Sequence, residues 1–485
     1  MSVQFERKQL VIILLIIFML GCGSEPGKQI IFKAEKSLHQ AEQLFKTASI
    51  KPDLSDIGTW QNVKDAYLST IAYCWTHIDS LTLDNFPSER KDLESVAFMA
   101  TSRLASIYFA ESKFDSSVII LRQLLSLTKL SDRSLLSSQS NLARAYHAKG
   151  DWASGIDIYK SMIDTFYPPI DAENKIMWEV LNLPLELQNI NIKLQNIPNT
   201  FEATKSTRDY YQRLITDWPD TDLEKEARRI LAGLLADYKK WDKAIETISV
   251  IKDSTGLIEI PESIRIAEYL SRGKNDHSAA IEIYEGLLER VDDSTMMANL
   301  YLRIAAAHFE NKSYSSCRET INYIKDRFYG FYMSDPAPQR YLALSFERQN
   351  EWNRAENEYQ WLITNFPGTE AAFETYLTIA EHYDNLNNDR MADLWYDKAD
   401  KFYLKMQAER KGSFIEASAI SYRAEVARRR GDWENAAKRL EELFHRFPDK
   451  EVGLKSLNNA IDIYRNRLSN PAKADSLQSI FRSGT

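Results

Sequence analysis

A pattern of small, aromatic and bulky apolar positions recurs along most of this chain at helical spacing. One complete copy reads YLALSFERQNEWNRAENEYQWLITNFPGT (341–369). Further copies read NLARAYHAKGDWASGIDIYKSMI (141–163) and YRAEVARRRGDWENAAKRLEELFHRFP (422–448). Because apolar residues three or four positions apart indicate amphipathic helices, each copy predicts two helices joined by a tight turn.

The first residue of each second helix serves as a phase marker. The markers are Phe114, Trp152, Thr204, Trp241, His277, Tyr314, Trp352, Asp389 and Trp433, most of them 36–38 residues apart. Nine residues before a marker there is usually an alanine: Ala105, Ala143, Ala232, Ala305, Ala343, Ala380 and Ala424, with Ala267 ten before its marker. Helices cross closely only where side chains are small, so we expect these alanines at the crossings and the aromatic markers between successive hairpins. Gly150, Asn350 and Gly431 mark the turn inside a hairpin, where a left-handed residue is tolerated.

Two stretches depart from this rhythm. The segment 172–196 contains extra residues, is interrupted at Pro184 and has Gln195 where alanine is expected. It is either a degenerate repeat that bends the array or a surface specific to a partner. Residues 29–94 also have helical periodicity and are expected to form an N-terminal cap. The repeats themselves fill 95–482, which allows about nine to ten hairpins.

The composition excludes several classes of function. The net charge of −8 argues against a general nucleic-acid binder, which needs a clustered basic face. The run Arg428-Arg429-Arg430 is expected to be a solvated helix face. Cys74 and Cys317 lie far apart in an array whose distant repeats do not touch, so we expect no disulfide between them.

The N-terminus has the features of a secretory signal. Arg7 and Lys8 precede an apolar run, 10–20, which is too short to span a bilayer but suits the hydrophobic region of a signal peptide. Met19-Leu20-Gly21-Cys22 resembles the bacterial lipobox. That resemblance implies a signal peptide at 1–21, lipidation of Cys22 and a polar tether at 22–28. Gly23, rather than Asp, follows the cysteine. This resembles the pattern of lipoproteins that are sorted to the outer membrane, which implies a protein that faces the periplasm. A plain signal peptide or short anchor with a chance cysteine is the alternative.

The repeated residues resemble the tetratricopeptide repeat family. The pattern W-x2-A-x3-Y-x2-L-x4-P is complete from Trp352 to Pro367. The resemblance implies an all-α fold, in which tandem antiparallel helix hairpins stack into a right-handed α-solenoid. Segments such as YQRLITDWPDT (211–221) and LEELFHRFPDK (440–450) resemble the longer repeats of bacterial envelope lipoproteins of the BamD and CpoB type.

The sequence predicts no catalytic site. None of the seven histidines belongs to an H-E-x-x-H pair, no G-x-S-x-G or phosphate-loop motif occurs, and no cysteine–histidine spacing suits a metal. No cofactor is expected either. Repeats occupy the chain almost to Thr485, which leaves no room for a separate catalytic domain.

A partner-binding groove is predicted on the first helices of the hairpins, which line the concave side of such arrays. Six charged residues face away from the packing alanines there: Arg144, Arg229, Arg340, Glu381, Glu425 and Arg428. They would suit a peptide of mixed charge, although they could also be simply solvated. Ser140 and Arg144 replace two positions of the clamp in chaperone-binding domains of this family, so recognition of an acidic C-terminus is not expected.

Two functions are compatible with these features. The leading one is a non-catalytic scaffold, anchored by lipid in the envelope, that binds protein or peptide partners in outer-membrane assembly, secretion or cell-wall coordination. The alternative is a glycan-capturing outer-membrane lipoprotein of the SusD type. Affinity for an oligosaccharide that depends on Trp178 or Trp60 would favour this alternative.

Overall fold

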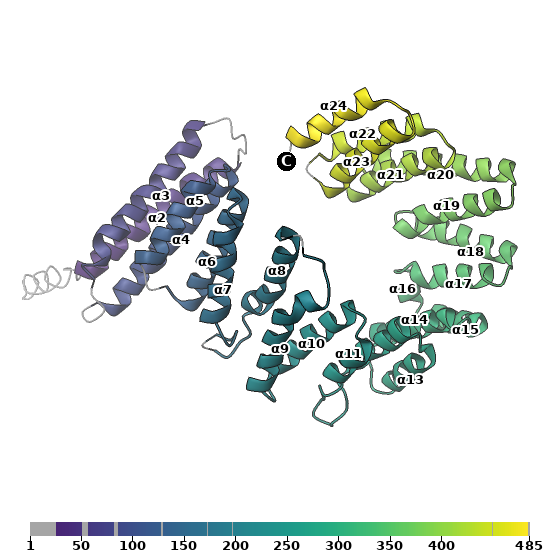
Figure 1. Ribbon diagram of the computed structural model, residues 1–485, viewed down its shortest axis with the longest axis horizontal. Coiled ribbons are helices and arrows are strands. Elements are labelled where there is room, and N and C mark those ends of the chain that lie inside the picture. Colours follow the sequence, from purple (N-terminus) through teal and green to yellow (C-terminus); the bar gives the residue numbers. More distant parts are fainter. Residues whose placement is uncertain are drawn as a thin grey trace, which may run out of the picture. The chain divides into compact units, whose positions relative to one another are not determined.

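The computed structural model describes residues 26–50, 57–81, 86–127, 130–171, 173–195, 197–448 and 450–483. Over these residues the chain forms successive helices and no β-strand, apart from the isolated bridges Ile170–Ile176 and Lys252–Ile258 (Figure 1). The prediction of an all-α fold of tandem helix hairpins is confirmed. Cys22 lies outside the described residues, so its lipidation stays a prediction.

The chain divides into two compact units, Met1–Arg228 and Arg229–Thr485. The N-terminal unit contains α2 (Pro26–Ile50), α3 (Ile57–Ile78), α4 (Pro87–Ala110), α5 (Phe114–Leu127), α6 (Asp132–Lys149), α7 (Trp152–Thr165), α8 (Trp178–Leu194), the short turn η1 (Glu202–Thr204) and α9 (Lys205–Asp217). The boundary falls inside α10 (Asp222–Asp237).

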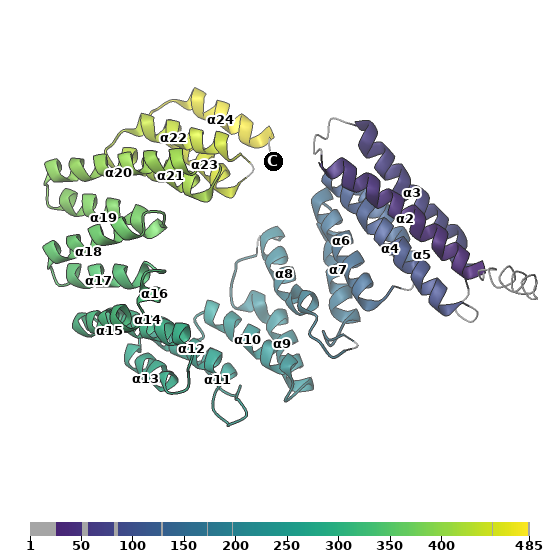
Figure 2. The same cartoon turned by 180° about the vertical axis from the view of Figure 1, so that it is seen from behind.

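The C-terminal unit contains the more regular repeats, which follow one another as helix pairs in both views (Figures 1 and 2). Its helices are α11 (Trp241–Ile248), α12 (Ile260–Glu268) with the turn η2 (Tyr269–Gly273), α13 (His277–Leu288), α14 (Ser294–Glu310), α15 (Tyr314–Arg327), α16 (Tyr329–Tyr332), α17 (Ala337–Glu347), α18 (Trp352–Asn365), α19 (Glu370–Asn385), α20 (Asp389–Glu409), α21 (Phe414–Arg429), α22 (Trp433–Arg446), α23 (Glu451–Asn466) and α24 (Pro471–Ser483).

The predicted phase of the repeat agrees with the helix boundaries. Every marker begins a helix except Thr204, which ends η1 directly before α9. All the alanines assigned to helix crossings are buried, with at most 3% of their surface exposed. Closely packed alanines therefore set the distance between the two helices of each hairpin.

The aromatic markers pack in two different ways. Trp352 stacks on His382 of the following hairpin, with 3.4 Å between ring centroids, as predicted for a marker that lies between successive hairpins. Trp152 instead stacks on His147 of its own hairpin, at 4.6 Å. The prediction that the markers lie between successive hairpins is thus correct for only part of the array, because His147 already fills the space beside Trp152.

A left-handed residue closes the turn of each regular hairpin, two positions before the marker. The predicted Gly150, Asn350 and Gly431 all have positive φ. The same position is left-handed in five further hairpins: Ser112, Lys239, Asn275, Lys312 and Asn387. The backbone thus needs this conformation even where the residue has a Cβ, which makes it less favourable.

The predicted cap shares its core with the first repeats. One cluster of buried side chains extends from Ile31 in α2 to Tyr146 in α6. The expected boundary at 94/95 lies inside α4, and α2 begins at Pro26, within the predicted tether.

The irregular segment 172–196 contains α8, with Pro184 inside the helix. Side chains from α9 hydrogen-bond to the α8 backbone near this proline. The Tyr211 hydroxyl donates to the Leu181 carbonyl at 2.7 Å, and the Thr207 hydroxyl donates to the Pro184 carbonyl at 3.3 Å. The interrupted helix is therefore packed as part of the array.

Candidate protein-interaction site

The six predicted groove residues do not form one site. Arg144 belongs to α6 in the N-terminal unit, where its guanidinium lies 5.7 Å from the Phe109 ring centroid. A small pocket of about 160 Å³ lies there, lined also by Asn141 and Ala105. The other five residues belong to the C-terminal unit.

Two of these five form separate ion pairs. Arg229 donates to Glu262 at 2.6 Å and to Glu259 at 3.1 Å, and the Glu262 side chain is only 2% exposed. Arg340 pairs with Glu374 of α19 at 3.0 Å, and both side chains are about half exposed. Arg229 is thus engaged in holding α10 to α12, whereas Arg340 stays accessible at the surface.

The remaining three residues meet around Arg429. Glu425 accepts from Arg428 and from Arg429, at 2.6 and 2.7 Å, and Glu381 accepts from Arg429 at 2.9 Å. Burial opposes the charge on Arg429, but its hydrogen bonds to Glu425 and Glu381 outweigh this effect and raise its pKa.

Arg428-Arg429-Arg430 is exposed, as predicted for a solvated helix face, but its side chains also form ion pairs. Arg430 also makes an ion pair, with Asp397 at 2.8 Å, and only Arg428 is as much as half exposed. The run links neighbouring hairpins because its carboxylate partners lie on α19, α20 and α21.

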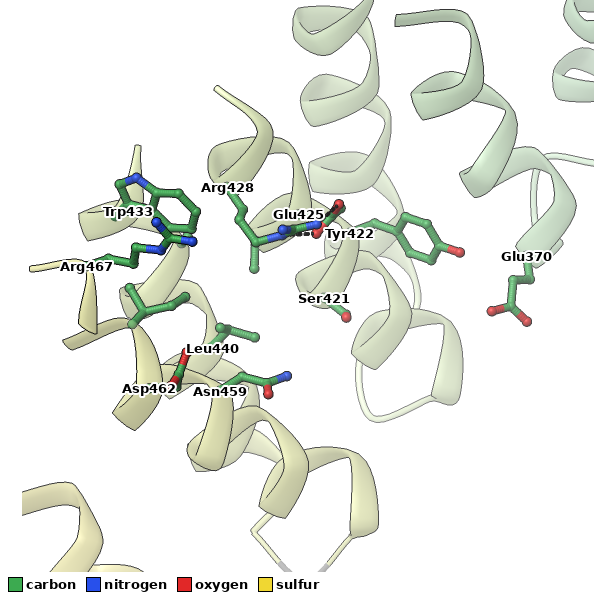
Figure 3. Close-up of a pocket in the computed structure, with 13 residues that line it drawn as sticks. Glu370, Ser421, Tyr422, Glu425, Arg428, Trp433, Leu440, Asn459, Asp462 and Arg467 are labelled. Atoms are coloured by element: carbon green, nitrogen blue, oxygen red, sulfur yellow. Dashed lines mark hydrogen bonds and ion pairs between the residues drawn. The ribbon is translucent and has the colours of Figure 1, made fainter. Parts of the chain in front are cut away.

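Beside this network lies a pocket of about 600 Å³, which we call the α21–α23 pocket (Figure 3). Its lining comes from α19, α21, α22 and α23: Glu370, Ser421, Tyr422, Ala424, Glu425, Arg428, Trp433, Ala436, Leu440, Asn459, Asp462, Ile463 and Arg467. The volume is in the range of small-ligand and peptide-side-chain sites.

The repeat explains why a hollow forms at this place. Ala424 and Ala436 are the small residues of the helix crossing in this hairpin, and Leu440 and Ile463 line the same hollow. The exposed lining of the pocket is mostly polar, with a smaller apolar part. Its charged and hydrogen-bonding groups therefore dominate what it presents to a partner.

Charges of both signs surround the pocket. Arg467 lies 4.7 Å from the centroid of the Trp433 ring, and Figure 3 shows the two side chains next to each other. Arg428 lies on the same edge, while Glu370 and Asp462 supply carboxylates. Such an edge can pair with a peptide that itself has both acidic and basic residues.

Tyr422 is a neutral hydrogen-bonding group of the pocket. Burial, together with the carboxylates of Glu374 and Glu370, raises its pKa to about 12. Its phenol consequently stays protonated at physiological pH and can donate a hydrogen bond. Ser421 and Asn459 add further polar groups without charge.

The sequence had indicated only Glu425 and Arg428 of this pocket. Asn459, Asp462 and Arg467 were missed because α23 was treated only as the closing hairpin. The spacing could have revealed Asp462. It lies nine residues before Pro471, and in other repeats an alanine stands nine residues before the first residue of the second helix. A polar residue at a packing position is a signal of a surface that stays open.

The remaining residues with possible chemistry have structural roles. Cys74 and Cys317 are free and buried, and burial raises the pKa of each thiol to about 12, which keeps both protonated. In the described part of the chain, no group of three or more His, Cys, Asp or Glu residues could hold a metal ion. Over the same residues, no helix has both the length and the apolar character needed to cross a membrane.

Comparison with known families supports the repeat assignment. Residues 418–450 match a family model described as tetratricopeptide repeat. This segment contains most of α21, all of α22 and therefore part of the pocket lining. This match covers 418–450 alone, whereas the tandem-hairpin fold extends over the other described repeats. Among curated proteins, no sequence matches the chain.

Several solved structures are similar to the chain at low sequence identity. A tetratricopeptide repeat protein from Parabacteroides merdae is 13% identical, covering 58% of this chain and 98% of its own, with a TM-score of 0.32. The C-terminal part of such a protein from Cytophaga hutchinsonii is 15% identical, covering 56% and 98%, with a TM-score of 0.32. Yeast Tom70 is 15% identical, covering 93% and 96%, with a TM-score of 0.35.

Proposed function

We propose that this protein is a non-catalytic scaffold that binds a peptide segment of a protein partner in the α21–α23 pocket. The observation that carries this proposal is the pocket itself, whose mainly polar lining includes charges of both signs and a smaller apolar part. A tandem-hairpin fold supports a role in protein interaction, because such arrays present extended surfaces to partners.

The proposed location is the bacterial envelope, with the chain anchored through lipid on Cys22. The basic residues before the apolar run 10–20, and the Gly21-Cys22 pair after it, support this location. Gly23 supports sorting to the outer membrane, on the side that faces the periplasm. In this location the scaffold would serve outer-membrane assembly, secretion or cell-wall coordination.

Charge reversal in the pocket tests the scaffold proposal. We expect Arg467→Glu to reduce the recovery of crosslinked partner from cells at least tenfold, measured by quantitative mass spectrometry against the unaltered chain. Lys438→Glu is the matched control, because Lys438 is exposed on α22 but does not line the pocket. Equal recovery with Arg467→Glu and Lys438→Glu would reject the pocket as the binding surface.

Glycan capture stays the second candidate because of one aromatic side chain. Trp178, the first residue of α8, is 51% exposed and could stack on a sugar ring. Trp60, the other aromatic considered, instead packs edge to face on Phe45, with 5.9 Å between ring centroids. Affinity for an oligosaccharide that is lost on Trp178→Ala would favour this candidate over the scaffold.

A further inference from the structure

One hairpin contains an extra residue, and the structure accommodates it as a π-helical turn. Ala267 precedes its marker by ten residues, whereas the other crossing alanines precede theirs by nine. In the same hairpin, α12 is followed by the π-turn Tyr269–Gly273. An α-helix can absorb a single extra residue in this way, and such turns are frequent at functional sites. The other hairpins reach the same crossing with nine residues, so packing alone does not require the insertion.

Specific contacts hold the π-turn in place. A Cβ built on Gly273 would lie only 2.3 Å from the Trp241 indole, so the glycine backbone packs directly on this ring. Lys274 pairs with Asp242 at 2.7 Å, and the Ser271 hydroxyl lies 2.9 Å from Nδ1 of His277. The turn is thus a packed feature of the hairpin and not a frayed helix end.

A second pocket, of about 350 Å³, lies beside this turn; we call it the π-turn pocket. Arg272 and Arg303 both line it, and Arg303 is paired with Glu268. Among the described residues, neither Arg272 nor Glu310, which also lines the pocket, has an ion-pair partner. Arg272, a residue of the π-turn, thus places an unpaired guanidinium at the pocket.

Two tyrosines line the pocket together with Arg272. Burial raises the pKa of Tyr341, Glu310 adds to this shift and Arg272 opposes it. Burial also raises the pKa of Tyr284, with Arg303 and Arg272 among the opposing charges. Both hydroxyls therefore lie within the field of Arg272 and remain protonated donors.

We propose that the π-turn pocket binds the carboxylate side chain of an internal acidic residue in an extended partner peptide. A guanidinium can donate two parallel hydrogen bonds to a carboxylate, and Arg272 is free to do so. Glu310 can then face a backbone N–H or a basic residue of the same peptide. A doubly charged phosphate fits less well, because Arg303 is already paired with Glu268 and only the single charge of Arg272 is left to balance the ligand. This inference rests on the proposed peptide-binding function but concerns a different pocket.

The test uses the full chain in detergent and an array of immobilised twelve-residue peptides. Each peptide has one central Glu, Gln or phosphoserine among neutral residues, with a free or amidated C-terminus. We expect at least tenfold stronger binding to Glu than to Gln peptides, independent of amidation. Arg272→Gln should remove this preference, Arg272→Lys should keep part of it, and Arg390→Gln, a control exposed on α20, should leave it unchanged.

Deletion of Ser271 provides a second variant, because it restores the nine-residue interval without changing any charge. We expect this variant to keep its helical fold, checked by circular dichroism, and to lose the preference for Glu. An unchanged preference in Arg272→Gln would overturn the inference, and so would stronger binding to phosphoserine or to free C-termini. Equal binding to Glu and Gln peptides would overturn the inference and leave the scaffold proposal intact. No binding to any peptide would count against both.

Discussion

Single glycines in helices show how closely the hairpins pack. A Cβ on Gly155 in α7 would lie 2.3 Å from the His147 ring, and that ring is already held between Trp152 and Tyr159. A Cβ on Gly286 in α13 would meet nothing within 4 Å. The same substitution should therefore have opposite effects at the two positions.

We predict that Gly155→Ala lowers the free energy of unfolding by about 1–3 kcal/mol through overpacking. Gly286→Ala should raise it by about 0.4–1 kcal/mol, because alanine loses less backbone entropy on folding. Urea denaturation of each variant measures both values. A stabilised Gly155→Ala variant would show that the α6–α7 contact is looser than described.

The stacked His382 predicts a dependence of stability on pH. Burial lowers its pKa, although Glu347 and Glu356 oppose the shift. An unfolded histidine has a pKa of about 6.5, so the unfolded state binds the proton more readily. The contribution of neutral His382 to the free energy of unfolding is thus fully present above about pH 6.5 and is lost as the pH falls below that value.

We expect His382→Gln to reduce the loss of thermal stability between pH 7.5 and pH 5.5. The midpoints of thermal unfolding at the two pH values, compared with those of the unaltered chain, measure this difference. If both proteins lose the same stability on acidification, His382 does not contribute to it.

At the scale of the element, the left-handed hairpin turns give a matched pair of substitutions. Lys312 and Gly431 occupy the same position of the repeat, with φ of 61° and 74°. Lys312→Gly should stabilise the protein by about 0.5–1 kcal/mol. A left-handed residue with a Cβ costs about 1–2 kcal/mol, and the larger entropy that glycine loses on folding offsets part of the gain from removing this cost. Gly431→Ala should destabilise by a similar amount, and urea denaturation measures both. If both substitutions stabilised the protein, or both destabilised it, the two turns would not share one geometry.

The sequence predicted the elements well because their determinants are local. Helix starts, crossing alanines and turn positions all follow from spacing within one hairpin. The partner of Trp152 could not be predicted, because it depends on whether His147 occupies the space beside it. The π-turn left a trace in the ten-residue interval at Ala267, but the spacing alone does not say where the helix widens.

For the whole molecule, the candidate site was predicted only in part. Charge facing away from the alanines indicated Glu425 and Arg428, and both line the α21–α23 pocket. It did not predict that Arg229 is engaged by a buried Glu262, because ion pairs between hairpins depend on tertiary packing. The proposed lipid anchor has its own test, which does not depend on the pocket.

We predict that Cys22→Ser releases the chain from membranes without unfolding it. Membrane fractionation in the absence of detergent measures the release, and circular dichroism of the purified variant checks its helical fold. A Cys22→Ser chain that is folded and still membrane-bound would show that lipid on this cysteine is not the anchor.

The most direct test of the scaffold is site-specific photocrosslinking in living cells. A photoreactive amino acid at Asn459, inside the α21–α23 pocket, is compared with one at Lys438, outside it. We predict a discrete adduct with one protein partner from Asn459, lost on Arg467→Glu, and no such adduct from Lys438. An adduct formed equally from both positions, or one from Lys438 alone, would contradict the pocket as the binding surface.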